Sequence, residues 1–146
     1  MRVAVIGLGV AGAAVSVLLK RMGGHSVEIF EKFPRARPIG SGILLQMTGM
    51  SVLDRLGALD HVLQHGAVVE RLYGTTDKSW WSMNGSNKQV SNSPGEDRVV
   101  LDLIYKEYKE SFFGLGVHRS TLFDSLYHQV CTEEIPVHFD THITGT

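Results

Sequence analysis

Hydrophobic and polar positions change their period along the start of the chain. Residues 3–6 form a short apolar run that predicts a buried strand, and residues 13–19 are apolar over most of a helix circumference. The helical pattern stops at Gly23 and Gly24, and a second strand-like segment follows at residues 26–30. This order predicts a strand, a helix and a second strand that belong to one parallel sheet.

Shorter elements follow this first unit. Residues 48–56 are amphipathic and predict a helix that Gly57 closes, and residues 60–64 add one more helical turn. Residues 68–73 then predict a strand. Residues 74–98 are polar and rich in turn-forming residues, so this segment shows neither a helical nor a strand periodicity.

The last part of the chain predicts one more helix and one more strand. The helix begins near Arg119, and Ser120 or Thr121 is placed to cap its N-terminus. Alternating apolar residues from 135 to 139 predict another strand of the parallel sheet. The apolar helix positions, spaced by three or four residues, are Leu122, Phe123, Leu126, Tyr127 and Val130.

Together these elements predict an α/β fold with a Rossmann-like parallel sheet. We expect one discontinuous domain from residues 1–72 and 114–146, with residues 73–113 beginning an inserted, sheet-rich layer. The chain has 146 residues, of which 43% are hydrophobic, enough to bury about two thirds of its unfolded surface.

Three glycines form the pattern G-x-G-x-x-G between the first strand and the first helix. Gly7 permits the tight turn, Gly9 lets backbone approach a pyrophosphate, and Gly12 lets the helix pack close to the strand. The helix start, with the backbone of Val10 and Ala11, offers unpaired N–H donors and the positive end of the helix dipole. The pattern predicts a dinucleotide site, with a purely structural glycine turn as the alternative.

Glu31 supports the dinucleotide interpretation because it ends the second strand, nineteen residues after Gly12. An acid at this place accepts hydrogen bonds from the ribose hydroxyls of an adenosine. The rival interpretation makes residues 3–19 a signal sequence or a membrane span. The three glycines of the pattern would weaken a helix over these residues, and this rival interpretation gives no reason for Glu31. We therefore expect no membrane span.

Net charge and cysteine count limit the kinds of partner and the cellular compartment that we expect. A net charge of −1 predicts neither a nucleic-acid nor a membrane-surface partner. The single cysteine, Cys131, has no partner for an internal disulfide, which favours a reducing, cytoplasmic location. We expect Cys131 to be an interior helix residue rather than a nucleophile. No sequence pattern fixes an oligomeric state.

Histidine spacing gives no metal site. His61 and His65 lie four residues apart, as do His138 and His142, but no acidic or cysteine ligand set accompanies either pair. A strand separates residues four apart too widely for one ion, which argues against the second pair. We therefore expect structural or solvent-exposed histidines and no metal.

Two later segments accompany the glycine pattern. Glu31 and Lys32 precede the run R-P-x-G-x-G-I-x-L at residues 37–45, and V-H-R-x-x-L occupies residues 117–122. With these segments the chain resembles the class A flavoprotein monooxygenases, the aromatic hydroxylase family that includes para-hydroxybenzoate and salicylate hydroxylases. Ordinary NAD-binding Rossmann domains lack both later segments.

The resemblance implies FAD as the cofactor and NADH or NADPH as co-substrate. It implies that Arg119 reaches the FAD near its pyrophosphate or ribityl chain, while the backbone at Gly40 approaches the flavin. Gln46 is expected near the flavin or the substrate, and no side chain is expected to act as a catalytic base. The cofactor-binding residues expected are Gly7, Gly9, Val10, Ala11, Gly12, Glu31, Lys32, Ser41, Gly42 and Arg119.

The activity implied by the resemblance is an FAD-dependent monooxygenase reaction. NAD(P)H reduces FAD, and one oxygen atom of O2 is transferred to a small aromatic substrate. Two downstream family motifs, a D-G segment and a G-D-A segment, are absent from these 146 residues. We therefore expect an N-terminal fragment with an incomplete fold, which binds FAD weakly if at all and does not hydroxylate by itself.

Two alternatives to the monooxygenase interpretation remain open. An NAD(P)-dependent dehydrogenase or reductase shares the glycine pattern, although it also needs a nicotinamide-side motif. A non-catalytic remnant of the flavin fold, acting as a binding module, is the other alternative. It would bind a protein partner through an exposed sheet edge.

Overall fold

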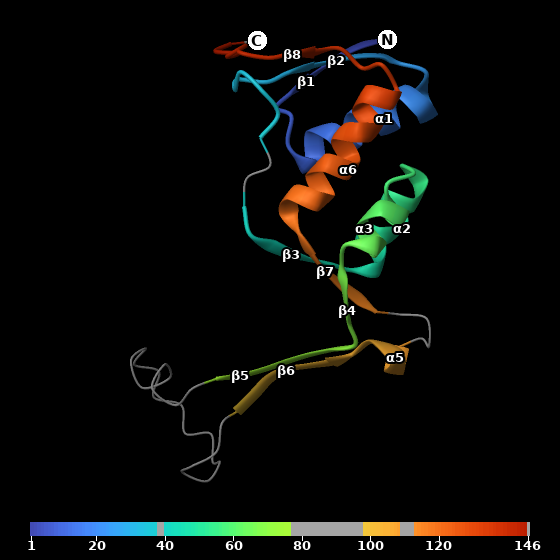
Figure 1. Cartoon of the computed structure of the whole chain (residues 1–146), viewed down its shortest axis with the longest axis vertical. Coiled ribbons are helices and arrows are strands. Elements are labelled where there is room, and N and C mark those ends of the chain that lie inside the picture. The colour runs from blue at the N-terminus through green and yellow to red at the C-terminus, as the bar shows by residue number, and fades with distance from the viewer. Residues whose placement is uncertain (38–39, 77–97, 109–112, 146) are drawn as a thin grey trace. The chain divides into compact units, whose positions relative to one another are not determined.

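The structure is a computed structural model, and it divides into two compact units (Figure 1). The first unit comprises Met1–Val68 and Leu115–Thr146, and the second comprises Val69–Gly114. The residues that it describes are 1–37, 40–76, 98–108 and 113–145.

A parallel sheet at the start of the first unit confirms the predicted strand–helix–strand order. Strand β1 spans Arg2–Ile6, helix α1 spans Val10–Gly23 and strand β2 spans Ser26–Phe30. The short strand β8, Val137–His138, pairs with the other edge of β2, so the strand order is β1-β2-β8. The chain thus returns to the first sheet more than one hundred residues later.

Ile29 occupies the centre of this sheet. It pairs with Val5 on one side and Val137 on the other, and it is fully buried. Full burial of such a side chain stabilises a protein by about 1.5–3 kcal/mol.

Helix α6, Arg119–Thr132, lies alongside α1 (Figure 1). The predicted apolar face is confirmed, since Leu122, Phe123, Leu126 and Val130 are buried and Tyr127 is half-buried. Our prediction for Cys131 was wrong, because this residue is exposed. It follows Val130 by one position, and successive helix residues point about 100° apart, which turns Cys131 away from the packed face.

A second, three-stranded sheet forms another part of the first unit. Strand β7, Gly114–His118, lies between β3, Gly42–Leu45, and β4, Ala67–Val69. The predicted helices are present as α2, Met47–Arg55, and α3, Leu59–Gln64. No helix in the described ranges is both long enough and apolar enough to cross a bilayer.

The strand predicted at residues 68–73 is divided in the structure. Strand β4 ends at Val69, and β5 begins at Arg71 and continues to Thr76. The two segments have different partners, since β4 pairs with β7 and β5 pairs with another strand of the second unit. A continuous apolar pattern cannot show such a change of partner.

The second unit contains an antiparallel ribbon of two strands. Strand β5 pairs with β6, Arg98–Ile104, and the short helix α5, Tyr105–Tyr108, follows. Arg71 pairs with Ile104 near the end of the ribbon that leads into α5, and its guanidinium reaches diagonally across the ribbon to form a bidentate ion pair with Asp102. Most of the predicted turn-rich segment, residues 77–97, lies outside the described residues, and the assignment of residues 73–113 to a substrate layer stays a prediction.

Candidate cofactor site

The glycine turn between β1 and α1 has the geometry that its sequence demands. Gly7 has a φ of +97°, a conformation that side chains disfavour, and its N–H donates to the carbonyl of Phe30 at 2.8 Å. A Cβ on Gly12 would lie 2.0 Å from the carbonyl oxygen of Gly7. The turn and the helix therefore contact each other through backbone alone.

Gly9 faces open space at the start of α1. A Cβ added there meets no described atom within 4 Å, and its φ of −99° is ordinary. Gly9 accepts the first helical hydrogen bond, from the N–H of Ala13 at 2.9 Å. Within the described residues no side chain caps this end, and the first turn holds no acidic residue. The N–H groups of the first turn are thus available to an anion.

Glu31 lies at the mouth of the same turn. Its carboxylate accepts hydrogen bonds from the backbone N–H groups of Leu8, at 2.6 Å, and Phe33, at 2.9 Å. The residue is 8% exposed. The structure thus brings the predicted acid and the predicted glycine turn together, and it adds two backbone donors that the sequence analysis did not identify.

A second group of predicted residues meets at the start of α6. Gly42 pairs with His118 across β3 and β7, and the N–H of Arg119 donates to the carbonyl of Ser41 at 3.1 Å. Gly40 has a φ of +120°, and a Cβ on it would lie 2.8 Å from Cδ of Arg119. The two family-like segments, far apart in sequence, are neighbours in space.

Helix α6 is capped by a residue that we did not predict. The ring nitrogen Nδ1 of His118 accepts a hydrogen bond from the N–H of Ser120 at 3.3 Å. The prediction that Ser120 or Thr121 caps the helix was wrong, because the N-cap residue is His118 and the helix begins at Arg119. Arg119 is therefore the first helical residue and is exposed, as a ligand-binding guanidinium needs to be.

The basic loop after Glu31 is organised around an aromatic ring. The Lys32 ammonium lies 5.0 Å from the centre of the Phe33 ring, and the Arg37 guanidinium lies 5.4 Å from it. Both distances are within the range of cation–π attraction. Gln46 occupies the N-cap position of α2 and is exposed. The cofactor roles of Lys32 and Gln46 stay predictions.

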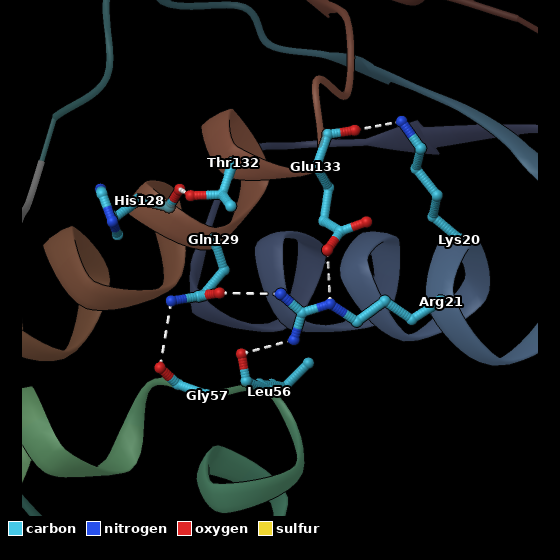
Figure 2. A network of polar contacts seen from close by, with 8 residues as sticks. All are labelled: Lys20, Arg21, Leu56, Gly57, His128, Gln129, Thr132 and Glu133. Atoms are coloured by element: carbon cyan, nitrogen blue, oxygen red, sulfur yellow. Dashed lines mark hydrogen bonds and ion pairs between the residues drawn. The ribbon is translucent and has the colours of Figure 1, made fainter.

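A polar network joins the C-terminal ends of α1 and α6 (Figure 2). The Arg21 guanidinium donates to Glu133 Oε1 at 2.6 Å, to Gln129 Oε1 at 2.9 Å and to the carbonyl of Leu56 at 2.7 Å. Lys20 donates to the carbonyl of Glu133. These bonds hold together the two helices whose opposite ends carry Gly9 and Arg119.

Comparison with known proteins finds flavin enzymes. The 3-amino-4-hydroxybenzoate 2-monooxygenase of Streptomyces cremeus is 39% identical over 98 residues, which are 67% of this chain and 23% of that protein. The FAD-dependent monooxygenase atnA of Arthrinium sp is 25% identical over 126 residues, 86% of this chain and 14% of that protein. The chain is a relative of the FAD-dependent aromatic monooxygenases. No family model matches the chain.

A solved structure of this group has a similar fold. The tetrameric form of 2-methyl-3-hydroxypyridine-5-carboxylic acid oxygenase superposes with a TM-score of 0.69 at 25% identity, covering 95% of this chain and 31% of that one. The chain thus spans less than a third of the length of each of these monooxygenase relatives. The comparisons confirm the predicted family, fold class and FAD dependence of the relatives. The residue roles and the domain boundaries stay predictions.

Proposed function

We propose that this chain is the FAD-binding part of an NAD(P)H- and O2-dependent monooxygenase that hydroxylates a small aromatic compound. The observation that carries the proposal is the open space at Gly9, where the uncapped start of α1 meets a buried carboxylate. An adenine dinucleotide needs this combination of N–H donors for its diphosphate and an acceptor for its ribose.

The residues present fit FAD. A carboxylate has about four lone-pair positions, so Glu31 can still accept bonds from ribose hydroxyls after the two bonds to backbone. Arg119 brings a fixed fork of N–H donors, which suits phosphate and hydroxyl oxygens. At Gly40 and Gly42 no side chain prevents the backbone from lying against a flat ring.

Each group has a distinct part in the proposed reaction. FAD, when bound, supplies the redox chemistry, with electrons taken from NAD(P)H and oxygen taken from O2. The start of α1 binds the diphosphate, and Glu31 holds the adenosine ribose. Arg119 orients the other half of the cofactor and places a positive charge beside it. No described side chain is assigned a proton-transfer step.

A cytoplasmic location is part of the proposal. The reaction consumes NAD(P)H, and the single cysteine gives the chain no internal disulfide that an oxidising compartment would favour. The proposed partners are the aromatic substrate and the nicotinamide co-substrate.

Titration of the purified chain with FAD, followed by flavin fluorescence, tests the proposal. We expect weak but saturable binding that ADP competes away, and no O2-dependent consumption of NAD(P)H by this chain alone. Two results contradict the proposal: no binding of FAD or ADP by the folded chain, or a clear preference for NAD⁺ over FAD. The second result favours the dehydrogenase alternative.

A further inference from the structure

The carboxylate of Glu31 joins the glycine turn to the end of β2. Oxygen Oε2 accepts the bond from Leu8, and Oε1 accepts the bond from Phe33. Leu8 lies between Gly7 and Gly9, so the first bond restrains the backbone of the turn itself. A hydrogen bond to an ionised, buried acceptor is about twice as strong as one between neutral groups.

The backbone of Glu31 is itself held on the side of β8. Its N–H donates to the carbonyl of His138, and its carbonyl accepts from the N–H of Thr141, both at 2.9 Å. The N–H of Asp140 donates to the carbonyl of Phe33 at 3.1 Å. The carboxylate therefore projects toward Leu8 from a backbone that is fixed before any ligand binds.

The glycine turn needs such a restraint. Glycine loses more conformational freedom on folding than any other residue, and this turn contains Gly7 and Gly9 in close succession. The first hydrogen bond within α1 is the one from Ala13 to Gly9, so the helix does not order the backbone before Gly9. Gly7 donates to the carbonyl of Phe30, and the Leu8 side chain, which is 5% exposed, packs here, so the bond from Leu8 to Glu31 adds to these restraints at the residue between the two glycines.

We propose that Glu31 is a positioning residue that holds the backbone of Leu8 and Gly9 in the diphosphate-binding conformation before the nucleotide arrives. This inference rests on the proposed FAD-binding function and extends it, because the carboxylate then acts in the unligated protein as well as on the ribose. A turn that is already ordered loses less entropy on binding, so the restraint raises affinity without a contact to the diphosphate.

Amide hydrogen exchange, measured by NMR on the unligated chain, tests this role. After correction for intrinsic rates, we expect the wild-type Leu8 amide to exchange more slowly than that of Gly9. Glu31→Ala removes both acceptor oxygens, and we expect exchange at Leu8 and Phe33 to accelerate about tenfold or more. Glu31→Gln keeps a single acceptor oxygen, so we expect one of these two amides to lose its protection.

A matched control separates the restraint from a general effect of losing an acid. Glu28 lies on the same strand but contacts Arg2 and His138 instead of the glycine turn. We expect Glu28→Gln to leave exchange at Leu8 unchanged. The proposal is overturned if Leu8 stays protected in folded Glu31→Ala, or if Leu8 and Phe33 both stay protected in folded Glu31→Gln. If those variants do not fold, equal exchange at Leu8 and Gly9 in the wild type overturns it.

The outcome is independent of the FAD titration. The exchange measurement contains no nucleotide, so a chain that binds no FAD still shows whether Glu31 protects Leu8. Conversely, FAD binding by a chain whose Leu8 amide is unprotected contradicts the positioning role alone and leaves the cofactor assignment in place.

Discussion

The carbonyl oxygen of Gly7 lies 2.0 Å from the point that a Cβ of Gly12 would occupy. No side chain fits there, because the neighbouring atoms belong to rigid backbone. We expect Gly12→Ala to push α1 away from β1 and to destabilise the chain by about 1–3 kcal/mol. Urea unfolding followed by circular dichroism measures this loss.

Substitution of Gly9 is the matched control for Gly12→Ala, because we expect it to affect FAD binding and not stability. Its φ suits alanine and its Cβ position is open, so we expect Gly9→Ala to unfold at the same urea concentration as the wild type. The added methyl lies where the diphosphate is proposed to bind, so FAD affinity falls. If Gly9→Ala binds FAD as well as the wild type, the diphosphate does not lie over this turn.

Arg119 offers a test of the second half of the site. We expect Arg119→Met to weaken FAD binding about tenfold or more, since a charge-assisted hydrogen bond is lost. Gly40→Ala acts on the same contact by displacing the Arg119 side chain, and we expect a loss in the same direction. Arg55→Met, an exposed charge on α2, serves as control and leaves the affinity unchanged.

The network around Arg21 predicts a stability effect far from the glycine turn (Figure 2). Arg21→Met removes three hydrogen bonds that join α1, α6 and the turn after α2, and we expect a loss of about 1–3 kcal/mol. Lys106→Met breaks only the exposed pair with Glu70, and we expect no measurable change. Equal unfolding midpoints for the two variants would falsify the proposed importance of the network.

The ribbon of the second unit carries a pH-dependent contact. Hydrogen bonds from Arg71, at 2.7 and 2.9 Å, hold the pKa of Asp102 below its ordinary value. The pair therefore contributes stability above the unfolded pKa, and that contribution disappears as pH falls through the lower, folded pKa. An NMR titration of the Asp102 carboxyl in the wild type and in Arg71→Met measures the shift, and an unchanged midpoint in the variant contradicts it.

Local signals predicted the elements that have clear boundaries. The strand predicted at residues 26–30 has the same bounds in the structure, and α1 ends where Gly24 turns to a φ of +58°. The strand expected at residues 135–139 is shorter in the structure, with only Val137 and His138 paired. Pro136 has no N–H to donate, and Asp140 has a φ of +51°. These two residues limit the pairing of β8 with β2 before Val137 and after His138.

Tertiary relationships account for what the sequence could not predict. The bond from the Leu8 N–H to Glu31 uses a backbone donor that every residue except proline possesses, so no residue type signals it. The pairing of β3 with β7 joins residues seventy or more positions apart. The capping role of His118 depended on where α6 begins, which periodicity defines only to within a residue or two.

The side-by-side course of α1 and α6 has an electrostatic consequence (Figure 1). The bonds between Arg21 and Glu133 join the two C-terminal ends, and neither helix has an acid in its first turn to offset its N-terminal partial charge. Like poles of two aligned dipoles repel, so the two N-terminal ends repel each other, and a bound multivalent anion offsets this repulsion. Inorganic phosphate or diphosphate should therefore raise the melting temperature of the chain, even without flavin.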